Sequence, residues 1–147
     1  MTNLQMGVTI ALALLVLFVT TSFHYEAISF LERRISIQTG SSRRAVPLLL
    51  SGLVAAHLVE IGFYAVAFAL AAGPLQLGSF SGDDQMGAFD LYYFAAETYS
   101  SLGYGDIVPN GGLRLVASIE PLNGLLLMAW SGAFLFSAVR TGPQSTE

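Results

Sequence analysis

Three long apolar stretches constrain the fold of this chain more than any other feature. They cover residues 4–23, 47–72 and 113–139. Each is about as long as, or longer than, the roughly 20 residues that a helix needs to cross a bilayer. The first stretch has no charged residue, and Glu60 and Glu120 are the only acidic residues in the second and third. The pattern predicts an all-α integral membrane protein with three transmembrane helices.

The composition excludes several other classes of protein. Only 11% of the 147 residues are charged, against about 25% in soluble domains, which is too few to cover a water-facing surface. A net charge of −4 offers no basic patch for nucleic acid, and the absence of cysteine removes disulfides and thiolate chemistry. Because no catalytic triad or metal-ligand pattern stands out, we expect no enzyme, no cofactor and no small-molecule substrate.

The first apolar stretch also has the length of a cleaved signal peptide. Such peptides begin with a positively charged region and end at a small-residue cleavage site. Residues 1–6 contain no lysine or arginine, and the positive charge follows the stretch instead. We therefore expect residues 1–23 to remain as an N-terminal transmembrane helix.

The arginines predict the orientation of the helices. Segment 24–46 holds four of the six arginines, and Arg140 follows the third stretch. Cytoplasmic loops carry the excess of positive residues. Segment 24–46 and the tail 140–147 should therefore face the cytoplasm, while the N-terminus and residues 73–112 face outside.

Segment 24–46 mixes apolar and charged residues between Ala27 and Ile37. This mixture is typical of an amphipathic helix that lies in the membrane interface, and Gly40 should end it. Pro47 suits the first turn of the next transmembrane helix, where its missing N–H costs nothing. The sequence thus predicts a cytoplasmic loop that carries one interfacial helix.

A shorter apolar segment lies between the second and third stretches. Residues 73–88 contain several glycines and aspartates and read as an exposed turret. Residues 89–101 follow with an aromatic side, and as a helix they extend only about 20 Å, too short to cross the bilayer. Asp90 complements the positive end of such a helix. We predict a re-entrant helix here.

Two glycines alternate with larger residues directly after this helix, in Leu102-Gly103-Tyr104-Gly105-Asp106. Alone, this string would suit an ordinary surface turn. Non-helical backbone at membrane depth, however, is tolerated only where it is buried in protein or lines a watery cavity. Glycine accepts positive φ without steric cost, so alternating glycines let successive carbonyls point the same way. In known selectivity filters, rings of backbone carbonyl oxygens from four such loops replace the water shell of a cation.

The stretch 98–106, Thr-Tyr-Ser-Ser-Leu-Gly-Tyr-Gly-Asp, resembles the T-x-T-T-V-G-Y-G-D filter of potassium channels. The likeness covers residues 90–139 and is typical of small bacterial pore-loop channels, here with an extra N-terminal helix. It implies a pore domain over residues 47–139 in a homotetramer that passes K⁺ down its electrochemical gradient through the cell membrane. The outer helix would cover residues 47–72, the filter residues 101–106 and the inner helix residues 113–139.

The resemblance also implies which residues meet the ion. The K⁺ ligands would be the carbonyls of the filter, together with the hydroxyl of its first residue; the filter consists of Ser101, Leu102, Gly103, Tyr104 and Gly105. Serine replaces threonine at positions 100 and 101, and leucine replaces valine at 102. A weakly selective cation channel is therefore an alternative, as is a non-conducting regulatory protein that keeps the fold. A transporter subunit fits less well, since transporters usually carry four loops in one chain.

Three filter-supporting residues are implied as well, namely Glu97, Ser100 and Asp106. In some bacterial potassium channels a carboxyl at the place of Glu97 contacts the aspartate after the filter. The same contact is expected here, with one carboxyl protonated. Glu97 reaching water behind the filter is the alternative.

Ionisable residues within the other stretches are functional candidates because the membrane makes them costly. His57 and Glu60 lie three residues apart on one helix face. They form either a proton-sensitive pair or a hydrogen bond that only holds helices together.

The third stretch should supply the cavity and gate. Gly124 falls where the family has a hinge glycine, and one helix face continues from it through Leu125, Met128, Gly132 and Phe136. Phe136 could constrict the pore by dewetting or pack against lipid or the first helix.

Overall fold

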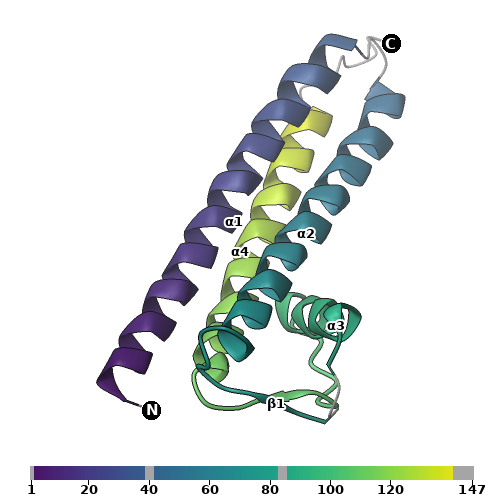
Figure 1. The fold of residues 1–147 in the computed structure, drawn as a ribbon. Helices are drawn as coiled ribbons and strands as arrows, with labels where there is room; N and C mark the ends of the chain where they lie inside the picture. Colours follow the sequence, from purple (N-terminus) through teal and green to yellow (C-terminus); the bar gives the residue numbers. More distant parts are fainter. Residues whose placement is uncertain (1, 39–41, 83–85, 141–147) are drawn as a thin grey trace, which may run out of the picture.

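The computed structural model describes residues 2–38, 42–82 and 86–140. Its elements are α1 (Asn3–Gln38), α2 (Ser42–Ala72), β1 (Phe80–Ser81), α3 (Ala88–Tyr99), β2 (Val108–Pro109) and α4 (Leu113–Arg140). Three long helices lie alongside one another, and the short α3 sits beside them at one end (Figure 1). The all-α membrane class predicted from the sequence is confirmed.

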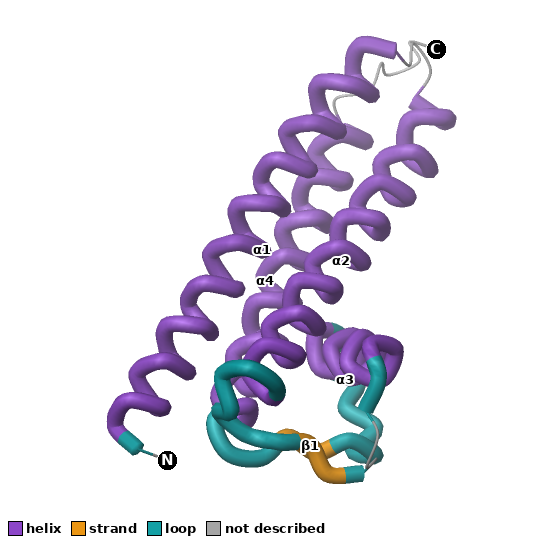
Figure 2. The backbone as a smooth tube through the Cα atoms, in the orientation of Figure 1, coloured by secondary structure: helices purple, strands orange, loops and turns teal. Residues whose placement is uncertain are grey.

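The three long helices are each long and apolar enough to cross a membrane, over Asn3–Ile35, Val46–Ala72 and Leu113–Arg140. Helix α1 packs against both α2 and α4, and α3 contacts α2 and α4. The end of α1, the start of α2 and the end of α4 lie together at one end of the bundle, opposite α3 and β1 (Figure 2). The chain is therefore a multi-pass membrane protein whose arginine-rich segment lies at the end remote from α3.

Helix α1 differs from the prediction. We expected it to end at Phe23 and a separate interfacial helix to follow, but α1 runs without a break to Gln38. No glycine or proline interrupts residues 24–38, and Ile28 continues the buried face with only 7% of its surface exposed. Leu31 packs against the backbone of Gly52 in α2. Residues 24–38 are helical as predicted, but they pack against α2 and continue α1 instead of forming a separate helix.

The start of α2 also differs. The helix begins at Ser42, so Pro47 lies inside it rather than in its first turn. The missing N–H of Pro47 removes one helical hydrogen bond, a smaller loss near a helix end, where water can satisfy the freed carbonyl. Most of the loop expected over residues 24–46 is thus helix.

An aromatic cluster fixes α3 against α2. Phe68 and Phe94 are 0% and 3% exposed and meet edge to face with ring centroids 5.0 Å apart. Phe80 of β1 closes the cluster, 5.0 Å from Phe94 and 5.8 Å from Phe68. Such pairs each add about 0.5–1.5 kcal/mol beyond their burial. The cluster therefore sets the angle at which α3 leaves the bundle.

We name residues 101–106 the glycine segment. A two-residue antiparallel ladder, not predicted from the sequence, joins the chain before α3 to the chain after the glycine segment. Phe80 pairs with Pro109 and Ser81 with Val108. Next to it, the Asn110 N–H donates to the Ser79 carbonyl at 2.8 Å. The chain leaving residues 101–106 is thereby tied to the turret. Residues 83–85 of the expected turret and 141–147 of the expected tail lie outside the described residues.

Candidate functional site

The C-terminal end of helix α3, where the last backbone carbonyls lie, leads into the glycine segment. Its start is capped by Asp90, whose carboxylate accepts the Gly87 N–H at 2.7 Å. At its end, the Glu97 carbonyl accepts the N–H groups of Leu102 and Gly103 at 2.8 and 3.2 Å. These two bonds turn the backbone sharply out of the helix. The glycine segment begins directly at the turn.

The backbone of this segment alternates in handedness. Ser101, Gly103 and Gly105 have φ of 60°, 55° and 79°, while Leu102 and Tyr104 are not among the described residues with positive φ. Alternation of this kind cancels the usual rotation of the chain, so that successive carbonyls can point to one side. Left-handed backbone costs a residue with a side chain roughly 1–2 kcal/mol, and Ser101 bears that cost. Such strain persists only where the surrounding structure holds the backbone in place, and it is concentrated at functional sites.

The glycine segment lies on the surface of the chain. Leu102 and Tyr104 are 58% and 68% exposed, and a Cβ added at Gly103 or Gly105 would meet no atom within 4 Å. The Tyr104 ring stacks on Tyr93 with centroids 6.3 Å apart and planes 2° from parallel. The chain therefore supports this segment on one side and leaves its other side open.

The expected contact between Glu97 and Asp106 is replaced by two separate contacts. The Glu97 carboxylate, 4% exposed, accepts the backbone N–H of Tyr104 at 2.9 Å. Asp106 accepts the hydroxyl of Tyr93 at 3.1 Å. Tyr93 stands beside Asp106 and supplies a donor to it, so the contacts that the structure gives these two carboxyls are with other groups. Each carboxyl thus holds its own part of the segment.

Tyr93 keeps its proton in this arrangement. Loss of surrounding water and the hydrogen bond to Asp106 raise the pKa of the Tyr93 hydroxyl above its ordinary value. A protonated hydroxyl remains a donor at neutral pH. The link from α3 to the residue after the glycines is therefore insensitive to physiological changes of pH.

Ser100, the third expected support, turns away from the glycine segment. Its hydroxyl donates to the Ala96 carbonyl at 2.7 Å, one turn back in α3. A hydroxyl that bonds to the preceding turn satisfies a helix-terminal carbonyl. Ser100 therefore closes the end of α3, and its support of the segment is indirect.

The face of α4 expected to line a cavity divides in the structure. Leu125, Gly132 and Phe136 are exposed, and the Arg140 guanidinium lies 5.6 Å from the centre of the Phe136 ring. Gly124 is buried instead, with its Cα against the carbonyl of Tyr99 at the end of α3. Met128 packs partly against the core. Gly124 is thus a contact point between α4 and α3 and does not share the exposed face.

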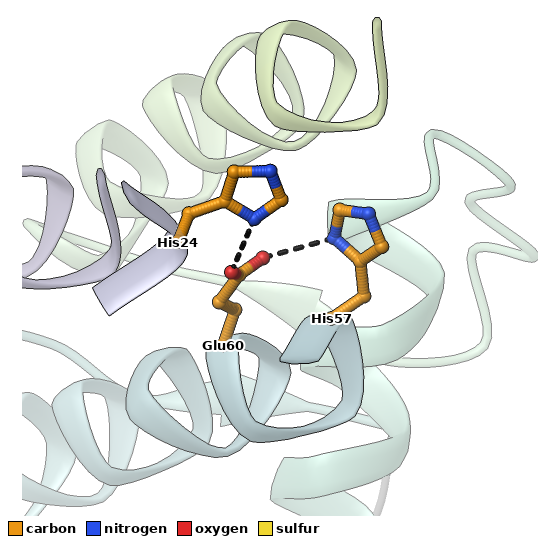
Figure 3. Close-up of side chains that lie close together, drawn as sticks. All are labelled: His24, His57 and Glu60. Carbon is orange, nitrogen blue, oxygen red and sulfur yellow. Dashed lines mark hydrogen bonds and ion pairs between the residues drawn. The ribbon is translucent and has the colours of Figure 1, made fainter. Parts of the chain in front are cut away.

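A polar cluster lies where α1, α2, α3 and α4 meet. The Tyr99 hydroxyl donates to the Glu60 carboxylate at 2.6 Å, and Nδ1 of His24 and Nδ1 of His57 lie within hydrogen-bond distance of the same carboxylate, at 2.7 and 2.9 Å. The Glu60 carboxylate lies between the two imidazoles (Figure 3). The expected pair of His57 and Glu60 is in contact, but the structure adds His24 and Tyr99. We name the set His24, His57, Glu60, Tyr99 and Ser131 the histidine cluster.

Two further polar residues of α4 are buried in the membrane-spanning region. Asn123 donates to the hydroxyls of Thr20 and Tyr64 at 2.7 and 3.0 Å, which joins α4 to α1 and α2. Glu120 is fully buried, and among the described residues neither of its carboxyl oxygens has a hydrogen-bond partner. Glu120 is therefore a costly residue, without a hydrogen-bond partner in the ranges that the structure describes.

The arrangement of helices defines a class of membrane protein. Two spanning helices that flank a short non-spanning helix and a glycine segment form a pore-loop membrane protein. A family described as "Ion channel" matches residues 55–141, which is more than half of the chain. The chain belongs to this ion channel family. Helix α1 lies outside the matched region.

One curated relative is 43% identical over 51 residues, the "Uncharacterized membrane protein YdjJ" of Bacillus subtilis (strain 168). The match covers 34% of this chain and only 15% of that protein. No solved structure matches the chain. The relative adds a membrane context and nothing about which ion is carried.

Proposed function

We propose that this protein is a potassium-selective channel in which four copies surround one central filter formed by residues 101–105. The observation that carries the proposal is the alternation of positive φ at Ser101, Gly103 and Gly105. This backbone lets each subunit present a row of carbonyl oxygens, which replaces the water shell of a dehydrated cation. The Ser101 hydroxyl would provide the innermost ligand.

The open side of the glycine segment supports assembly around an axis. The segment is held from behind by Glu97 and Tyr93, while Leu102 and Tyr104 stay exposed. The row of carbonyls from one chain cannot surround an ion by itself, so other copies of the chain must complete the enclosure. Potassium-channel filters are built from four loops, and because each chain has one glycine segment, four chains would complete such a filter. Leu125, Gly132 and Phe136 would then face the cavity below it.

The orientation follows from charge and fold together. The arginine-rich end of the bundle faces the cytoplasm under the positive-inside rule. The glycine segment, with α3 and β1, lies near the other end of the bundle (Figure 1). The filter and the N-terminus would therefore face outside, in the cell membrane.

Flux in liposomes tests the proposal directly. Purified protein is reconstituted with a K⁺ gradient, and ion flux is measured in K⁺ and in Na⁺, with and without external Ba²⁺. We expect K⁺ flux that Ba²⁺ blocks and much smaller Na⁺ flux. Equal fluxes would indicate a weakly selective cation channel, which the serines at 100 and 101 would explain. Flux no greater than in empty liposomes would favour a non-conducting protein.

Glu97 should contribute to selectivity. In Glu97→Val the Tyr104 N–H loses its acceptor, which costs about 1–3 kcal/mol per buried donor, and the segment is held less firmly. We expect the ratio of K⁺ to Na⁺ flux to fall about tenfold. Glu32→Gln, a change at an exposed carboxylate of α1, is the control and should leave the ratio unchanged. A wild-type ratio in Glu97→Val would mean that this bond does not shape the filter.

A further inference from the structure

The histidine cluster brings together three side chains that are common metal ligands. One ring nitrogen of His24, one of His57 and a carboxylate oxygen of Glu60 all lie within 4.8 Å of one another. In both histidines Nδ1 is the nitrogen that faces Glu60. The two rings come from different helices and converge on the same carboxylate (Figure 3).

The cluster is enclosed. The side chains of His24 and Glu60 are 0% exposed, and His57 is 16% exposed. A buried carboxylate at membrane depth requires a cationic or strongly donating partner. The partners of Glu60 are two imidazoles and a tyrosine hydroxyl, and in the part of the chain that the structure describes no lysine or arginine contacts it. A cation between the three ligands would meet the same requirement.

Ser131 shows which ring nitrogens are suited to carry hydrogens. Its hydroxyl oxygen lies 3.0 Å from Nε2 of His57 and 3.3 Å from Nε2 of His24. A hydroxyl has one hydrogen and can donate to only one of the two nitrogens, but it can accept from both. When both Nε2 atoms carry hydrogens and donate to Ser131, both Nδ1 atoms are free to bind a metal. Metal-binding histidines are typically oriented by such a second hydrogen bond.

We propose that His24, His57 and Glu60 bind one divalent transition-metal ion, for which Zn²⁺ is the best match. Two imidazoles and one carboxylate form a known three-ligand zinc set that leaves a fourth position open. Ligand atoms about 2.0 Å from zinc in a tetrahedron are about 3.3 Å apart. The Nδ1-to-carboxylate distances are 2.7 and 2.9 Å, so each nitrogen needs to move from its oxygen by only about half an ångström. The three ligand atoms all lie within 4.8 Å of one another. The Tyr99 hydroxyl lies 2.6 Å from the Glu60 carboxylate and 2.9 Å from Nδ1 of His57.

The site would connect helix α1 to the pore-loop region. His24 comes from α1, which lies outside the matched family region, whereas His57 and Glu60 come from α2. Tyr99 is the last residue of α3 and lies just before the glycine segment in the sequence. Its hydroxyl donates a hydrogen bond to Glu60. A bound ion would clamp α1 to α2 and fix the base of α3. The site itself does not depend on which ion the protein conducts.

Metal binding by the full chain tests the proposal. Protein with its affinity tag removed is dialysed in detergent against Zn²⁺, and bound zinc is measured per chain. We expect one ion per chain, with affinity at least about 100-fold weaker in His24→Gln and in His57→Gln. Glu120→Gln changes another buried carboxyl of the membrane region and should bind as wild type does. Binding equal in wild type and in a His24→Gln/His57→Gln double variant would overturn the site.

Co²⁺ supplies a second measurement that does not depend on loss of binding. In the wild type we expect the visible absorption bands of tetrahedral Co²⁺. The His24→Cys variant replaces a nitrogen ligand by a thiolate and should add a sulfur-to-cobalt charge-transfer band in the near ultraviolet. Fluorescence of Trp130, the only tryptophan, whose ring lies 5.5 Å from that of His24, reports whether each variant is folded. A folded His24→Cys variant without that band would refute ligation by residue 24.

Discussion

Replacing Gly103 with alanine should abolish K⁺ flux. Gly103 has φ of 55°, a conformation that costs a residue with a Cβ roughly 1–2 kcal/mol. In a tetramer the cost occurs four times, about 4–8 kcal/mol in all, and a factor of ten requires only 1.4 kcal/mol. The chain can relieve the strain by leaving the alternating conformation, which turns its carbonyls away from the axis. Liposome flux should fall at least about a hundredfold.

The matched control is Gly7→Ala. A Cβ at Gly7 also meets no atom within 4 Å, but Gly7 lies in α1 with ordinary φ. Alanine there improves helix propensity by about 1 kcal/mol, so flux should stay at the wild-type level. Normal K⁺ flux in Gly103→Ala would contradict the role given to the alternating backbone. Lost flux in both variants would point to a general failure of folding.

Hydropathy predicted the three long helices because crossing a bilayer demands long apolar stretches. It could not predict where α1 ends, because the apolar stretch stops at Phe23 while the helix continues through charged residues to Gln38. The ladder of β1 and β2 has two residues in each strand. That is too short for any alternating pattern to reveal it.

The glycine segment was predictable because its residues are consecutive, whereas the contacts around it depend on tertiary packing. Glu97 meets the Tyr104 backbone and Asp106 meets Tyr93, and no spacing rule distinguishes these contacts from a carboxyl pair. The partners of the expected His57–Glu60 pair were missed for the same reason. His24 lies just beyond the predicted end of the first helix, and Ser131 resembles many serines in membrane helices. The sequence feature that could have indicated a contact between His24 and the pair is that the chain has only two histidines.

Gly124 should behave as a packing residue, and Gly124→Ala tests this against the hinge role expected from its position. A Cβ at Gly124 would collide with the carbonyl oxygen of Tyr99 and lie 3.1 Å from its Cγ. Both are parts of the end of α3 that cannot rotate away, so α4 must move outward. Overpacking of this kind costs about 1–3 kcal/mol. We expect the melting temperature, followed by Trp130 fluorescence, to fall by roughly 5–10 °C.

The same change should disturb conduction, because Tyr99 leads directly into the glycine segment and its hydroxyl bonds to Glu60. Gly132→Ala is the control for stability, since it lies on the same helix and its Cβ meets nothing within 4 Å. Its melting temperature should equal or exceed that of the wild type, as alanine favours the helix by about 1 kcal/mol. If Gly124 acts only as a hinge, the melting temperature of Gly124→Ala should not fall. In that case the substitution would change only the open probability of single channels.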